Sequence, residues 1–139
     1  MSKYKGHVTI IVNVATYCGL TKTNYAQLNE IYAKHREAGL RIAGFPCNQF
    51  GKQEPGGCVE IKEFLKKNNV EFDVYEKIDV NGNGAHPLYK YLKHEQGGTL
   101  LDAIKWNFSK FLISKQGIPV KRYGPTDEPK VGIRRPQIS

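Results

Sequence analysis

A buried strand followed by a cysteine turn and a helix constrains this chain more than any other feature. The segment His7 to Ala15 is rich in valine and isoleucine and predicts a buried strand. From Thr21 onward, apolar residues recur at spacings of three and four, which predicts a helix that Thr21 caps and Gly39 ends. Cys18 is therefore expected in the turn between that strand and that helix.

The rest of the chain predicts a second strand, two short helices and a closing hairpin. Leu40 to Phe45 forms the second strand, and the turn-rich loop after it, FPCNQFGKQEPGG, is irregular. Residues at helical spacing mark the short helices: Ile61, Phe64 and Leu65 in one, then Leu88, Tyr91 and Leu92 along one face of another that begins at Pro87. Between these two helices, apolar residues stand at every second position: Val70, Phe72 and Val74. Gln116-Gly117 separates two β-rich segments, which predicts an antiparallel hairpin.

These elements predict one domain of the α/β class. Two βα units, a later helix and a hairpin amount to a thioredoxin-like fold, with a central mixed sheet flanked by helices. The 139 residues suit a single domain, and no repeat, linker or low-complexity tract divides them. The tail from about residue 126 contains prolines and little periodicity, so we expect it to be irregular.

Composition excludes several classes of protein. The longest mostly apolar run, Val8 to Ala15, is far shorter than the roughly 20 residues that cross a bilayer. No convincing cleavage site follows it, so we do not expect secretion. Three cysteines are an odd and sparse set, which disfavours a disulfide scaffold and favours a reducing compartment. We therefore expect a cytoplasmic protein, with a mitochondrial form as the alternative.

The net charge of +8 would attract anionic partners such as phosphates or acidic lipid headgroups. The basic residues are scattered singly, without the basic and aromatic repeats that line nucleic-acid channels. We therefore expect no nucleic-acid partner.

Cys18 is the residue best suited to chemistry. Backbone N–H groups and the dipole at a helix N-terminus favour a thiolate. The string from Cys18 to Thr21 is C-x-x-T where a disulfide oxidoreductase has C-x-x-C, so exchange between two cysteines of this turn is excluded. A single thiolate is suited to attack a small oxidant and form a sulfenic acid. An inert buried cysteine is the alternative, and position alone does not decide between the two.

Other kinds of site have little support. Cysteines at 18, 47 and 58 and four separated histidines match no zinc pattern, so we expect no metal. The chain has no G-x-S-x-G motif and no phosphate-binding glycine loop.

Gln53, Trp106 and Asn107 are candidate partners of the thiolate. Cleavage of an O–O bond needs neutral donors that stabilise the departing oxyanion, and amide and indole N–H groups supply them. The alternative is that Trp106 is an ordinary core aromatic and that the two amides are turn residues.

Three segments resemble the signature segments of the glutathione peroxidases: NVATYCG at 13–19, FPCNQFGKQEPG at 45–56 and IKWNFSKFL at 104–112. The resemblance extends from residue 5 to about 130 and includes KIDVNG, HPLYKYLK and VKRYGP. It implies a thioredoxin fold and reduction of hydroperoxides by thiols, with glutathione as co-substrate and no bound cofactor. It also implies that Cys18 stands at the position of the peroxidatic cysteine or selenocysteine, supported by Gln53, Trp106 and Asn107.

The connection from Tyr89 to Ile104 lacks the insertion that tetrameric members use to assemble. The chain therefore resembles the monomeric phospholipid-hydroperoxide type, whose open site admits lipid peroxides. Because the chain is basic, Lys22, Lys105 and Arg122 are candidates for contacts with anionic headgroups of a membrane surface, the alternative being ordinary solvated charges.

The sequence departs from the family in several ways. Thioredoxin-dependent members have a resolving cysteine near the position of Lys66, whereas Cys58 lies about two helical turns earlier and Cys47 fits a structural role. The family's N-terminal strand pair is missing, and VGIRRPQIS stands where a C-terminal helix is expected. A thioredoxin-dependent peroxidase that uses Cys58, and a non-catalytic truncated or structural protein, are therefore alternatives. The family motif has cysteine or selenocysteine at this position, so the resemblance leaves open a native form with selenocysteine at position 18.

Overall fold

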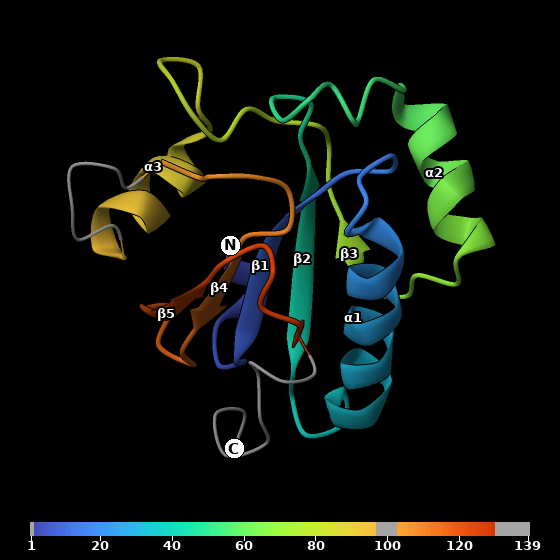
Figure 1. Cartoon of the computed structure of the whole chain (residues 1–139). Coiled ribbons are helices and arrows are strands. Elements are labelled where there is room, and N and C mark those ends of the chain that lie inside the picture. Colours follow the sequence, from blue (N-terminus) through green and yellow to red (C-terminus); the bar gives the residue numbers. More distant parts are fainter. Residues whose placement is uncertain (1, 97–102, 130–139) are drawn as a thin grey trace.

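The computed structural model describes residues 2–96 and 103–129 and contains one five-stranded sheet (Figure 1). A short 3-10 helix, η1 (Ser2–Tyr4), precedes the strands, which are β1 (Thr9–Val14), β2 (Arg41–Pro46), β3 (Asp73–Val74), β4 (Lys110–Ile113) and β5 (Pro119–Tyr123). The helices are α1 (Thr21–His35), α2 (Cys58–Lys67) and α3 (Pro87–Glu95).

The sheet is mixed, as predicted. Its order is β3-β2-β1-β4-β5, so the first strand of the chain lies in the centre. β1, β2 and β3 run parallel, whereas β4 runs antiparallel to both β1 and β5. The parallel pair β1 and β2 ends at Val14 and Pro46, and the loops that leave those ends are the two that carry the first two signature segments.

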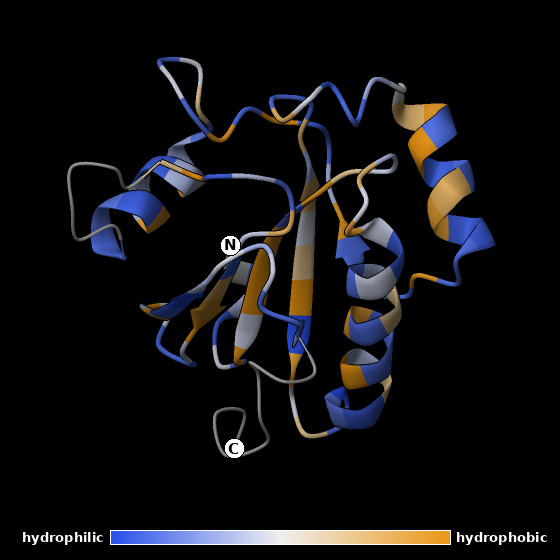
Figure 2. Ribbon diagram, in the orientation of Figure 1, coloured by the Kyte–Doolittle hydropathy of each residue, from blue (hydrophilic) through white to orange (hydrophobic). Residues whose placement is uncertain are grey.

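The central strand buries both of its faces against helices. Ile10 and Val12 of β1 pack in one apolar cluster with Leu28 of α1, and Ile11 packs in a second cluster with Leu92 of α3. Helices α1 and α3 therefore cover opposite faces of the sheet, and Figure 2 shows the hydrophobic residues gathered in its central strands. Burial of both faces explains the nearly continuous apolar run of β1.

Most predicted elements occur at the predicted places, with three differences. The structure has a strand that was not among those predicted, the two-residue β3, beside the alternation at Phe72. Tyr91 lies on the predicted face of α3 but is 43% exposed, whereas its neighbour Tyr89 is fully buried. The predicted cap of α1 is wrong, because Leu20 occupies the N-cap position and the hydroxyl of Thr21 bonds within the preceding turn.

The hairpin of β4 and β5 turns at Gln116-Gly117, where Gly117 has a φ of +82° that glycine adopts without strain. Residues 130–139, which include most of the predicted irregular tail and the segment VGIRRPQIS, lie outside the described residues, as do residues 97–102 of the connection to Ile104. In the described part of the chain, no helix is long and apolar enough to cross a membrane.

Lys110 is a fully buried lysine at the start of β4. Its Nζ donates to the carbonyl oxygens of Asp127, Pro125 and Gly124 at 2.8, 3.2 and 3.5 Å. Burial lowers the pKa of Lys110 to about 8, although the nearby acidic residues Asp127 and Glu128 oppose that shift. The ammonium thus holds the 124–127 turn against the sheet.

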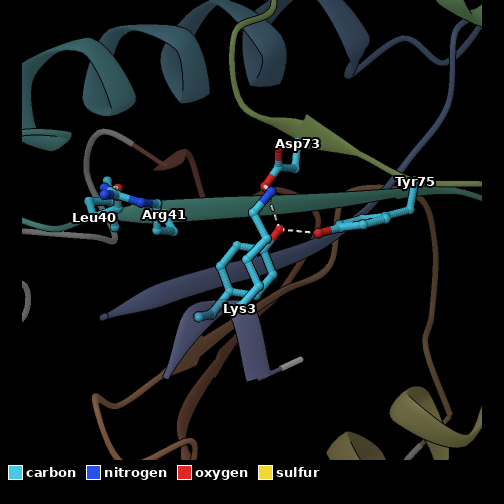
Figure 3. A network of polar contacts seen from close by, with 6 residues as sticks. Lys3, Leu40, Arg41, Asp73 and Tyr75 are labelled. Carbon is cyan, nitrogen blue, oxygen red and sulfur yellow. Dashed lines mark hydrogen bonds and ion pairs between the residues drawn. The ribbon is translucent and has the colours of Figure 1, made fainter. Parts of the chain in front are cut away.

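The first residues of the chain are fastened to the edge strand β3 (Figure 3). Lys3 forms an ion pair with Asp73 at 2.8 Å, and Tyr4 donates its hydroxyl to the same carboxylate at 2.7 Å. The hydroxyls of Tyr4 and Tyr75 share a hydrogen bond of 2.5 Å. Partial burial alone would raise the pKa of Asp73, but the bonds from Lys3 and Tyr4 outweigh it and lower that pKa.

Candidate active site

The turn that carries Cys18 is built by hydrogen bonds to Thr21. The Thr21 hydroxyl accepts from the Cys18 N–H at 3.1 Å and donates to the Ala15 carbonyl at 2.7 Å. The backbone N–H of Leu20 points at the Cys18 sulfur, with an N···S distance of 3.4 Å. Cys18 is half-buried, and the Leu20 N–H gives its sulfur a backbone donor.

Gln53 and Asn107 are brought together from loops 54 residues apart. The Asn107 side-chain amide donates to Gln53 Oε1 at 2.9 Å, and Asn107 is fully buried. The Gln53 carbonyl oxygen accepts from the N–H of Tyr17 at 3.0 Å, which joins this loop to the residue directly before Cys18. Within the described residues, no acceptor bonds to Gln53 Nε2, so that N–H group is available to a ligand.

Trp106 lies beside Gln53 across Gly51. A Cβ atom added at Gly51 would approach the Trp106 ring to 3.1 Å and Gln53 Nε2 to 3.4 Å. Trp106 is 36% exposed, and its ring packs against Phe50 with centroids 5.7 Å apart. The alternative of a buried core aromatic is therefore wrong for Trp106, because the residue is exposed.

Asn13 of β1 fixes the segment that carries Trp106 and Asn107. Its side-chain amide donates to the Trp106 carbonyl at 3.1 Å, and its own carbonyl accepts from Phe108 N–H at 2.7 Å. Phe108 has a φ of +65°, a strained conformation for a non-glycine residue that these contacts maintain. All three signature segments therefore meet at the carboxyl end of β1.

Glu54 is a buried carboxylate beside this site that sequence reasoning missed. It is 1% exposed, and its Oε1 accepts from the Thr16 N–H at 3.1 Å. Burial raises the pKa of Glu54, while hydrogen bonds from Thr16 act in the opposite direction. The residue stands inside the second signature segment, but a lone acidic residue in a loop is normally solvated, so no sequence pattern indicated its burial.

The other two cysteines differ in their surroundings. Cys47 is buried, its thiol donates to Gln49 Oε1 at 3.6 Å, and burial raises its pKa. Such a thiol suits the structural role expected for Cys47. Cys58 is exposed at the first residue of α2, and all three cysteines are free.

The predicted basic residues are dispersed. Lys22 is exposed on the first turn of α1, and Lys105 is exposed directly before Trp106. Arg122 is half-buried in β5, where it donates to the Ala103 carbonyl at 2.8 Å and lies over the Phe111 ring at 5.3 Å. Arg122 therefore has structural contacts in addition to the headgroup role predicted for it. No cluster of three or more metal-ligating side chains occurs in residues 2–96 and 103–129.

The fold and its cysteine turn define the class. This chain is similar to a thiol:disulfide interchange protein of the thioredoxin family from Chlorobium tepidum TLS, with a TM-score of 0.62. The two sequences are 16% identical, and the match covers 94% of this chain and 81% of the other. The chain therefore has a thioredoxin-like fold, as predicted, with Cys18 in the turn that follows its central strand.

The sequence then defines the family. Residues 1–93 match the model of the family described as Glutathione peroxidase, and the chain belongs to that family. It is 56% identical over 133 residues to "Phospholipid hydroperoxide glutathione peroxidase" of Callithrix jacchus, covering 94% of this chain and 68% of the relative. The crystal structure of T. cruzi GPX1 matches with a TM-score of 0.74 at 39% identity, over 94% of this chain and 78% of that one. The predicted family and enzyme class, a peroxidase, are confirmed.

Proposed function

We propose that this chain reduces hydrogen peroxide and organic hydroperoxides, phospholipid hydroperoxides included, with Cys18 as the nucleophile and glutathione as the electron donor. The observation that carries the proposal is the chain of hydrogen bonds from Asn107 through Gln53 to Tyr17. It joins three segments that are distant in sequence at the residue next to Cys18. The name of the Callithrix jacchus relative supports the phospholipid substrate.

In the oxidative step, the Cys18 thiolate attacks the terminal oxygen of the hydroperoxide. The S–O bond forms as the O–O bond breaks, and the alkoxide leaves and takes a proton to become the alcohol. The peroxide is reduced and Cys18 is oxidised to a sulfenic acid. Gln53 Nε2 and Trp106 Nε1 are neutral donors suited to the departing oxyanion, and Asn107 holds Gln53 in place through its Oε1.

In the reductive steps, glutathione thiolate attacks the sulfenic sulfur, and the hydroxyl group leaves as water after taking a proton. The product is a mixed disulfide of Cys18 and glutathione. A second glutathione thiolate attacks the glutathione sulfur, which releases glutathione disulfide and returns Cys18 as a thiol. Two glutathione molecules are oxidised for each hydroperoxide reduced.

A thioredoxin-dependent cycle through Cys58 is the second candidate. Its supporting observation is that Cys58 is free and exposed. Cys58 begins α2 and lines a groove together with Val74 of β3, and no residue of the Cys18 turn lines that groove. We therefore favour glutathione.

We also propose a monomer that works at an anionic membrane surface, in the cytoplasm or in a mitochondrial form. Exposed Lys22 and Lys105 and the net charge of +8 support attraction to such a surface. A selenocysteine at position 18 would perform the same attack, because a selenolate is also a nucleophile. The test of monomer formation is the mass in solution at enzyme concentrations used for assay.

The central experiment is a single-turnover measurement of peroxide reduction. Cys18→Ser should abolish it, and Gln53→Ala, Trp106→Phe and Asn107→Ala should each slow it, by about 100-fold where a direct donor is lost. Gln116→Ala, a change of an exposed amide in the hairpin turn, is the matched control and should keep the full rate. Wild-type rates in two of the three donor variants would remove those residues from the site.

A further inference from the structure

A pocket of about 400 Å³ lies between the Cys18 turn and α2. In Figure 1, α2 stands beside the turn that joins β1 to α1. The residues that line the pocket and bear polar groups are Thr16, Tyr17, Glu54, Glu60, Glu63 and Lys67. Tyr17 directly precedes Cys18, so one wall of the pocket is formed by the residue next to the nucleophile in sequence.

Glu54 supplies this pocket with a buried carboxylate that lacks part of its hydrogen bonding. Its Oε1 bonds to Thr16, another residue of the pocket wall, which places the carboxylate at that wall. Its Oε2 is buried and has no hydrogen-bond partner among the described residues. Burying an acceptor without a donor costs free energy. A ligand that donates a hydrogen bond to Oε2 recovers that free energy on binding.

The charge of the pocket contrasts with that of the chain. Three carboxylates and one ammonium line the pocket, on a protein whose net charge is +8. Lys77 also acts electrostatically on Glu54, but its Nζ donates to the Gly56 carbonyl at 2.6 Å. The pocket therefore favours a cationic group, and an ammonium ion with its three N–H donors fits carboxylate acceptors. The ammonium group of Lys67 can pair with one carboxylate group of a ligand.

An ammonium and a carboxylate on one carbon form the end of a free amino acid. Glutathione carries such an end on its γ-glutamyl residue, and its thiol is one residue away. We propose that this pocket binds the γ-glutamyl end of glutathione, with the α-ammonium at Glu54 and the α-carboxylate at Lys67, while the thiol reaches Cys18. An extended γ-glutamyl-cysteine spans roughly 7–10 Å, which suits a pocket that begins next to Cys18.

This inference rests on the proposed function and adds a recognition site for the reductant. Glu60 and Glu63 of α2 contribute charge near the ammonium, and they act in the reductive steps only. The hydroperoxide reacts before the reductant binds, so the pocket leaves the rate of the oxidative step unchanged. The pocket should also discriminate against thiols that lack an amino group.

The test measures binding and the two half-reactions separately. The binding probes are S-methylglutathione, which cannot react, and its N-acetylated form, which lacks the ammonium; calorimetry gives the Kd of each. The wild-type protein should bind the free amine about tenfold more tightly than the N-acetylated probe. Glu54→Gln, which keeps the acceptor for Thr16, and the double variant Glu60→Gln/Glu63→Gln should remove that preference.

The matched control is Glu37→Gln, an exposed carboxylate outside the pocket, which should keep the preference. In single turnover, the pocket variants should reduce the sulfenic acid about tenfold more slowly with glutathione and at the wild-type rate with 2-mercaptoethanol. Circular dichroism checks that each variant is folded. If Glu54→Gln does not fold, the double variant Glu60→Gln/Glu63→Gln, which changes two exposed residues of α2, still tests the proposal.

The two ideas fail in different ways. Equal binding of both probes by the wild-type protein, or equal losses with both thiols in the α2 double variant, would overturn the pocket assignment. Absence of peroxide consumption at Cys18 would overturn the proposed function, whereas a preference for the free amine would then still support the pocket.

Discussion

Replacing Lys110 by methionine should remove a pH dependence from the stability of this protein. Methionine retains an apolar stem of similar length but cannot be protonated. Burial lowers the pKa of Lys110 to about 8 in the folded state, against 10.5 for the ordinary side chain. Between these two values the unfolded chain binds more protons than the folded protein, so the free energy of unfolding rises with pH in that window.

The size of the effect follows from the same two pKa values. Each unit of difference corresponds to about 1.4 kcal/mol, and integration from pH 7 to pH 9.5 gives a gain of about 2 kcal/mol. This gain in the free energy of unfolding is complete above pH 10.5 and is lost as the pH falls through about 8. Tyr4 and Tyr25 have raised pKa values and act in the opposite direction above pH 10, so measurements should stop at pH 9.5.

The assay is urea unfolding at pH 7, 8, 9 and 9.5, comparing the wild-type protein with Lys110→Met. The difference between their free energies of unfolding should change by about 2 kcal/mol in favour of the wild type across the series. Lys115→Met, which removes an exposed lysine from the hairpin turn, should show no such change. A constant difference for Lys110→Met would refute the argument and would mean that the three carbonyl contacts offset the burial of the ammonium.

Three other changes have defined outcomes. Gly51→Ala adds a Cβ 3.1 Å from the Trp106 ring at a φ of +64°, so peroxide reduction should fall about tenfold and stability by about 1 kcal/mol; an unchanged rate in stopped flow would show that the position of the ring is unimportant. Cys58→Ser should leave glutathione-dependent turnover intact, and a trapped Cys18–Cys58 disulfide in the parent protein would contradict this. Lys105→Glu should slow reduction of phospholipid hydroperoxide on anionic vesicles about tenfold but spare hydrogen peroxide, with a smaller effect at high salt; equal losses would argue against surface attraction.

Local patterns were enough to predict the elements that pack with their own neighbours in sequence. The valines and isoleucines of β1, the three-and-four spacing of α1 and the glycine turn at Gly117 each indicate one conformation. The cap of α1 was missed because Thr21 bonds to the turn before it, which depends on the path of residues 15–18. The strand β3 was not predicted; it is two residues long and pairs only with Ala43 and Gly44 of β2.

The site depended on contacts that span much of the chain. Gln53 and Asn107 were selected by their chemistry and by a family resemblance, but only the folded chain shows that one amide holds the other. The buried charges were harder still to predict from the sequence, because the positions of Glu54 and Lys110 in the sequence resemble those of solvated residues. Their burial follows from tertiary packing: Thr16 receives the carboxylate, and the carbonyls of the 124–127 turn receive the ammonium.

The order of the strands also affects how this protein is made. Of the five strands of this sheet, β1 leaves the ribosome first, yet it is the central strand, and its partner β4 lies about 100 residues further along the chain. At ordinary rates of synthesis, roughly 5–20 s pass before Val12 can pair with Lys110. Until then one edge of an apolar strand is unprotected, and the Cys18 thiol is present without Trp106 and Asn107. A nascent chain therefore exposes an oxidisable thiol before it has the residues that direct its chemistry, and chaperone binding at β1 would protect both.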